Sequence, residues 1–153
     1  MVRNLIRSRT GSAALEFAIC APVMLGMFAV MVDAGNLVRG RITLAGAVGT
    51  AAQFAGMSGA TVTAATLQNV VTNVASTAGL TATSTVSGPA CYCPTAYPVT
   101  LTSATCGATC ATNSQPASTY VIINGTYTYT PIAPHLSKIV TTTLTETATV
   151  LLQ

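Results

Sequence analysis

Apolar positions follow three different patterns along the chain. Residues 17–32 (FAICAPVMLGMFAVMV) form an apolar run without a charged side chain. Over residues 40–56, and again over 63–78, apolar residues recur every three or four positions, which is typical of an amphipathic helix. Beyond Gly79 the period changes to two, as in half-buried β-strands. This order predicts a long apolar helix, a second helix and a small sheet.

The apolar run, extended to residues 12–38, is long enough to cross a membrane. About 20 helical residues, each rising ~1.5 Å, span a hydrocarbon layer of ~30 Å. Pro22 is a candidate kink, because its ring removes a backbone donor inside the helix. The amphipathic pattern over residues 40–56 predicts that the same helix continues, with candidate breaks at Gly46 or Gly49. A second helix is expected over 63–78 and ends at Gly79.

Three strands are expected, at residues 80–86, 120–130 and 139–152. In the last strand a threonine stands at every second position from 141 to 149, opposite apolar residues that start at Val140 and end at Leu152. Glu146 falls on the apolar side and is therefore expected near an edge. The predicted fold is α+β: a long N-terminal transmembrane helix that continues outside the membrane, a second short helix, and a small antiparallel sheet of about three strands.

Charge is scarce and unevenly placed. The 153 residues include 6 basic and 3 acidic side chains, so 6% are charged, where a typical soluble domain has roughly 25%. This composition excludes a disordered polyampholyte, a heptad coiled coil and a polybasic nucleic-acid binder, so no nucleic-acid partner is expected. Arg3, Arg7 and Arg9 precede the apolar run and predict a cytoplasmic N-terminus. Arg39 and Arg41 oppose this orientation mildly and are expected at the far headgroup layer.

Three kinds of processing signal are compatible with a basic N-terminus followed by an apolar run. A general secretory signal would need a small-residue cleavage site, but Ala45-Gly46-Ala47 lies beyond Arg39 and Arg41. A lipoprotein signal would need small residues just before Cys20, and Phe17-Ala18-Ile19 stands there instead. A prepilin-type leader fits better: it ends at Gly11, the apolar helix begins at Ser12, and Glu16 and Phe17 occupy the fifth and sixth positions after the glycine.

The motif G-S-A-A-L-E-F, with its basic flank and apolar helix, resembles the TadE-like pseudopilins of the tight-adherence (Flp) branch of type IV pilus machinery. The resemblance covers about residues 10–56. It implies that a prepilin peptidase cleaves between Gly11 and Ser12 on the cytoplasmic face. It also implies a place in the bacterial inner membrane or at the filament base, with other pilin-like subunits and the inner-membrane pilus platform as partners. The segment Y-x-Y-T-P-I-A-P-H-L at residues 127–136 resembles the ends of TadE-like proteins less specifically.

Two carboxylates flank the apolar run. An ionised Glu16 inside the bilayer edge would cost up to about 2.5 to 3.5 kcal/mol and would need a partner. The new amino group at Ser12 of a neighbouring copy is a natural one and would set a register between helices; the alternative is a solvated Glu16 at headgroup depth. For Asp33 a solvated helix exit is favoured over an ion pair with Arg39 or Arg41.

Four of the five cysteines cluster in one loop. The predicted topology places this loop outside the inner membrane, where disulfides form. Two cross-loop disulfides are favoured, because a bridge between positions two apart in an extended chain is close to the geometric limit. A four-thiolate zinc site is the alternative, with unusual C-x-C and C-x3-C spacings. The fifth cysteine, Cys20, is expected to pack as a small apolar residue. The loop cysteines are Cys91, Cys93, Cys106 and Cys110.

Catalytic groups are few. His135 is the only histidine and follows a proline in a predicted turn, so a solvated loop histidine is expected. The carboxylates Glu16, Asp33 and Glu146 form no acid–base pair or metal triad in the sequence, and no nucleophile, phosphate-loop or dinucleotide motif is present. We therefore expect no enzymatic activity, no metal and no cofactor.

The expected organisation is a leader at residues 1–11, a transmembrane helix at 12–38, a helical stem at 39–78 and an outer β domain at 79–153. The outer domain contains the cysteine-rich loop at 87–118 and lies in the periplasm or outside the cell. The predicted function is non-catalytic: a processed pseudopilin that takes part in assembly of an adhesive pilus. The alternatives are an uncleaved single-pass envelope binding protein with a cystine-stabilised outer domain, and an envelope enzyme.

Overall fold

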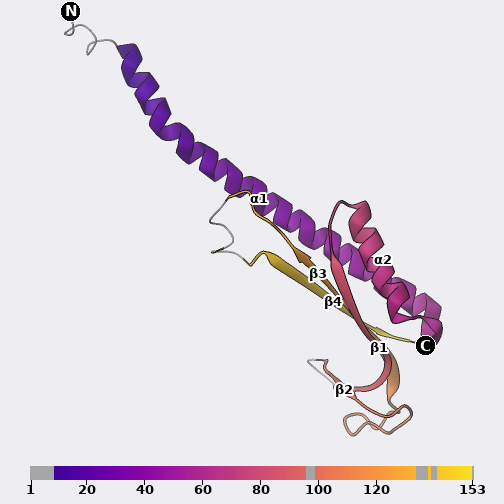
Figure 1. Cartoon of the computed structure of the whole chain (residues 1–153). Coiled ribbons are helices and arrows are strands. Elements are labelled where there is room, and N and C mark those ends of the chain that lie inside the picture. Colours follow the sequence, from indigo (N-terminus) through magenta and orange to yellow (C-terminus); the bar gives the residue numbers. More distant parts are fainter. Residues whose placement is uncertain (1–8, 96–98, 134–137, 139–140, 153) are drawn as a thin grey trace, which may run out of the picture. The chain divides into compact units, whose positions relative to one another are not determined.

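The computed structural model describes residues 9–95, 99–133, 138 and 141–152. The chain divides into two compact units, and Figure 1 shows its helices and strands. One comprises Met1–Val38 with Thr130–Thr142, and the other comprises Arg39–Tyr129 with Thr143–Gln153. The first unit therefore combines the N-terminal part of the long helix with a short segment from near the C-terminus. The second unit contains the remaining helices and the sheet.

The helix α1 (Arg9–Ser58) is continuous over 50 residues and contains Pro22. The candidate breaks at Gly46 and Gly49 are wrong. Neighbouring residues Leu44, Ala47 and Val48 are buried in the core of the second unit. Their packing stabilises the helix against the ~0.5–1 kcal/mol that each interior glycine costs. A short 3-10 helix, η2 (Gly59–Thr61), follows α1 directly.

The second helix, α2 (Ala64–Thr77), confirms the prediction for residues 63–78. The hydroxyl of Thr63 caps its first turn by accepting the Thr66 N–H at 3.2 Å, a typical N-cap contact. Beyond its end Gly79 has φ +80°, a conformation that glycine adopts without strain. The buried face of α2 consists of Leu67, Val71 and Ala75.

The sheet has four antiparallel strands in the order β2-β1-β3-β4. They are β1 (Thr83–Pro94), β2 (Leu101–Ser103), β3 (Ser118–Thr128) and β4 (Thr143–Leu151). The strand missing from the sequence prediction is β2, which is three residues long and too short to show a period. The first strand also continues beyond the predicted residue 86, past an irregularity between Ser87 and Ala90. Residues 139 and 140, expected at the start of the last strand, lie outside the described part.

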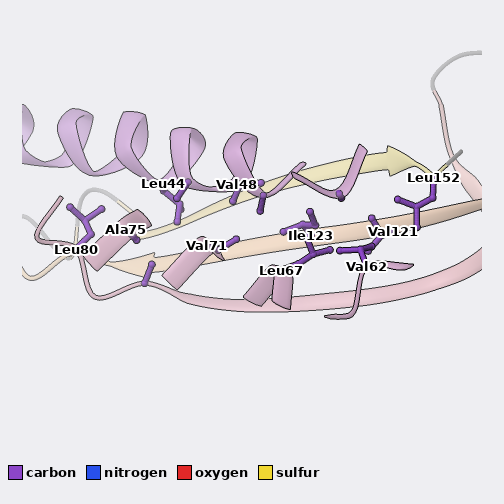
Figure 2. Packing of buried hydrophobic residues seen from close by; sticks show 14 residues of the cluster. Leu44, Val48, Val62, Leu67, Val71, Ala75, Leu80, Val121, Ile123 and Leu152 are labelled. Atoms are coloured by element: carbon purple, nitrogen blue, oxygen red, sulfur yellow. The ribbon is translucent and has the colours of Figure 1, made fainter. Parts of the chain in front are cut away.

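One face of the sheet packs against the helices, and on the other face β4 presents threonines. Figure 2 shows the buried side chains of α1, α2 and β3 gathered in one cluster. In β4 every threonine from 143 to 149 is exposed and the residues between them are half-buried. The predicted core side and solvent side of this strand are therefore confirmed. The cluster includes Leu44, Val48, Leu67, Val71, Val121 and Ile123.

Gly125 of β3 lies close to α1. A Cβ at this position would lie 2.7 Å from Val48 Cγ2 and 3.0 Å from Leu44 Cδ1. The cross-strand neighbour of Gly125 is Glu146, the charged residue on the core side of β4. Glu146 Oε1 accepts a hydrogen bond from Arg41 Nε at 3.1 Å. The charge is accommodated because β4 is an edge strand, as predicted, and because α1 supplies the guanidinium.

Candidate functional site

The apolar part of α1 exposes large side chains in all directions. Between residues 13 and 31 every residue is exposed except Ala21 and Ala29, which are half-buried. By length and composition, the helical stretch Ala13–Thr61 is able to cross a membrane. A helix that is apolar on all sides needs a bilayer or other apolar helices around it. The exposed large residues are Leu15, Phe17, Ile19, Val23, Met24, Leu25, Met27, Phe28, Val30 and Met31.

The predicted processing motif lies at the start of this helix. Gly11 and Ser12 fall within the first turn of α1. Glu16 is exposed and stands next to Phe17, whose side chain is 73% exposed. A carboxylate therefore lies among exposed apolar side chains. Arg3 and Arg7 of the basic flank lie outside the described residues.

A shallow, open depression lies in the middle of the apolar stretch. Gly26 is part of its lining, and a Cβ added at Gly26 would meet no atom within 4 Å. Small residues of this kind allow apolar helices to approach one another closely. The surface is therefore suited to contact with another helix. Its lining residues are Pro22, Val23, Gly26, Met27, Val30 and Met31.

Residues 11–53 match the family model of TadE-like proteins. The resemblance predicted over about residues 10–56 is thereby confirmed, and the match begins at the glycine of the predicted cleavage site. We refer to residues 11–53 as the TadE-like segment. The match supports an association of this protein with the tight-adherence pilus. Neither a curated protein nor a solved structure matches the chain. The resemblance of residues 127–136 to the ends of TadE-like proteins lies outside the segment and stays a prediction.

Asp33, within the TadE-like segment, is not solvated, so the favoured prediction for it is wrong. Its side chain is fully buried. Oδ1 accepts the Ile132 N–H and Oδ2 accepts the Ala133 N–H, both at 2.8 Å. Neither Arg39 nor Arg41 is needed to explain the burial, because charge-assisted bonds from backbone amides satisfy the carboxylate. Nothing in the local sequence signals these partners, which come from a segment about a hundred positions away.

The four loop cysteines form two disulfides beyond the TadE-like segment. Cys91 pairs with Cys106 and Cys93 pairs with Cys110. Both bridges cross the loop, in agreement with the favoured prediction and not with the zinc site. Among the described residues, no group of three or more histidine, cysteine or acidic side chains is arranged to hold a metal ion.

The other candidate groups from the sequence analysis are Cys20, Glu146 and His135. Cys20 is a free thiol and is exposed on the apolar part of α1. We expected this side chain to be packed. Glu146 is paired with Arg41, so one of the two cations that oppose the predicted orientation has a carboxylate partner. The prediction for His135 lies outside the described residues.

Proposed function

We propose that this chain is a non-catalytic pseudopilin that takes part in assembly of an Flp/Tad-type adhesive pilus. It is anchored in the bacterial inner membrane with its N-terminus in the cytoplasm, and a prepilin peptidase cleaves it between Gly11 and Ser12. The observation that carries the proposal is the TadE-like match, which begins at Gly11 and continues into a helix with apolar side chains on all sides.

The exposed apolar surface supports two successive environments for the helix. Before assembly, a bilayer surrounds the side chains between residues 13 and 32. During assembly, other pilin-like helices and the inner-membrane platform replace part of the lipid, and the open surface at Gly26 permits close contact. The outer domain, residues 79–153 with the loop 87–118, then lies in the periplasm or outside the cell.

Glu16 has a specific part in this proposal. After cleavage, Ser12 carries a new amino group four residues before Glu16 in the sequence. If a neighbouring subunit offers this amino group to Glu16, the ion pair offsets a burial cost of up to about 2.5 to 3.5 kcal/mol. Such a pair forms at one axial offset between helices, so it would fix their register.

Cleavage is the decisive test. The full chain is expressed in a bacterial membrane with and without a prepilin peptidase, extracted in detergent and measured by intact mass. We expect the mass of a chain that begins at Ser12 only when the peptidase is present. Gly11→Ala should abolish this shift, whereas Gly26→Ala, a glycine in open space on the same helix, should leave it unchanged. Retention of Met1 in every sample would favour the uncleaved envelope binding protein.

The register role of Glu16 needs a separate measurement. Glu16→Gln keeps the shape of the side chain but removes its charge. We expect this variant to be cleaved normally and to reduce surface piliation, because the subunit inserts but does not dock. Unchanged piliation would refute the role of Glu16 without affecting the proposed cleavage.

A further inference from the structure

Asp33 joins a segment from the C-terminal third of the chain to the end of the apolar run. Its carboxylate accepts one backbone N–H from Ile132 and one from Ala133, each at 2.8 Å. The side chain of Asp33 is 0% exposed. Both partners belong to the same compact unit as the apolar helix. Residues 132 and 133 are therefore held at the level of Asp33 on α1.

Asp33 lies at one end of the part of α1 that has the length of a hydrocarbon layer. The charge-free run ends at Val32, directly before Asp33. At 1.5 Å per residue, the helix from Ala13 to Val32 measures about 30 Å, which is the thickness of a bilayer core. Glu16 then lies within one turn of the other end of this stretch. When these residues span the core, Asp33 and the residues bonded to it lie at the boundary between acyl chains and headgroups.

The side chain of Ile132 is suited to that boundary. It is 66% exposed, although the Ile132 backbone is fixed by Asp33. The surrounding segment Thr130–Thr142 contains no acidic residue, and its one lysine, Lys138, is exposed. An exposed apolar side chain in a segment that carries a cation and no acidic residue is favoured at the surface of a bilayer that contains anionic lipids.

We infer that residues 130–133 are a lipid contact: Ile132 inserts between the headgroups and the upper acyl chains, and Asp33 positions it there. The occupant is a phospholipid bilayer. This contact would fix the depth of the helix at the end away from the leader. The inference rests on membrane insertion of α1, which is part of the proposed function, so the test measures insertion and loop contact separately.

Tryptophan is a clean probe because the chain contains none. Three full-length variants are reconstituted in vesicles of phosphatidylcholine and phosphatidylglycerol, with or without lipids brominated near the top of the acyl chains. Ile132→Trp reports the loop. Phe28→Trp reports the apolar helix, where Phe28 is 65% exposed. Val99→Trp is the matched control, an apolar residue that is 65% exposed in the other compact unit.

We expect brominated lipid to quench Phe28→Trp and Ile132→Trp and to leave Val99→Trp unquenched. The emission of Ile132→Trp should also shift to shorter wavelength than that of Val99→Trp. Quenching of Phe28→Trp without any quenching of Ile132→Trp would overturn the lipid contact while leaving membrane anchoring intact. An unquenched Phe28→Trp would overturn anchoring itself, and with it the inference.

The positioning role of Asp33 is tested in the same system. Asp33→Asn removes the charge and leaves one acceptor oxygen for two N–H groups. In this background we expect the quenching of Ile132→Trp to fall towards the level of Val99→Trp, while Phe28→Trp stays quenched. Full quenching of Ile132→Trp in the Asp33→Asn background would refute the positioning role.

Discussion

At Gly125, replacement by alanine should destabilise the protein. A glycine-to-alanine change inside a helix or strand usually stabilises it. Gly125→Ala would place a Cβ 2.7 Å from Val48 Cγ2 and 3.0 Å from Leu44 Cδ1. Ordinary contact begins at 3.4 Å, and Val48 is only 2% exposed. The branched side chain of Val48 therefore has little free space into which it can move, and the contact between α1 and β3 must open instead.

The magnitude follows from two opposing terms. Overpacking a well-packed core costs about 1–3 kcal/mol. Replacing an interior strand glycine by alanine restores roughly 0.5–1 kcal/mol of backbone entropy. We therefore expect Gly125→Ala to lower the free energy of unfolding by about 1 kcal/mol, within a span of roughly 0–2.5 kcal/mol. Gly46→Ala is the matched control, because a Cβ there meets no atom within 4 Å. It should raise the free energy by roughly 0.5–1 kcal/mol.

The assay is urea unfolding of the detergent-solubilised full chain, followed by near-ultraviolet circular dichroism of its tyrosines. This signal reports the second unit because the Tyr127 ring lies 3.0 Å from where a Cβ of Gly40 would stand, and Tyr92 packs edge-on against Tyr120. Val48→Ala removes the clashing methyl, so Gly125→Ala should cost less in the Val48→Ala background than in the natural chain. Our argument about close packing would be refuted if Gly125→Ala stabilised the protein as much as Gly46→Ala does.

Two further variants address the disulfides and the ion pair. Replacing Cys93 and Cys110 together by alanine should lower the free energy of unfolding by about 3 kcal/mol, because the bridge closes a short loop in the unfolded chain; Cys20→Ser should have no effect in the same urea assay, and equal losses for both would contradict this account. Glu146→Gln should cost less than about 1 kcal/mol, since the Arg41 side chain is 71% exposed and solvent screens the pair. This loss should shrink in high salt, and a larger, salt-independent loss would indicate that the pair acts as a buried one.

Local pattern was sufficient for the elements whose character depends on neighbouring residues. The charge-free run, the apolar period of α2 and the threonine alternation of β4 each appear within a few turns or residues of sequence. The motif from Gly11 to Phe17 that suggested the TadE-like resemblance is equally local, and the family match over residues 11–53 confirms that resemblance. The sequence also identified Glu146 as a misfit on the core side of its strand.

Local pattern was misleading where the outcome depends on packing between distant segments. Gly46 and Gly49 carry a low helix propensity, yet α1 is continuous there because flanking residues are buried against the sheet. The strand β2 exists because it pairs with the end of β1, not because its three residues favour a strand.

The sequence by itself determined that this protein has an apolar helix with a prepilin-type motif, a second helix and a sheet whose last strand has a threonine side, because hydrophobic period and capping are properties of adjacent residues. Only the tertiary structure decided which cysteines pair, which cation meets Glu146 and what covers Asp33. The amides that bond to Asp33 lie 99 and 100 positions away in the chain. A carboxylate at a helix exit is solvated or buried according to the path of a distant segment, and no local pattern records that path.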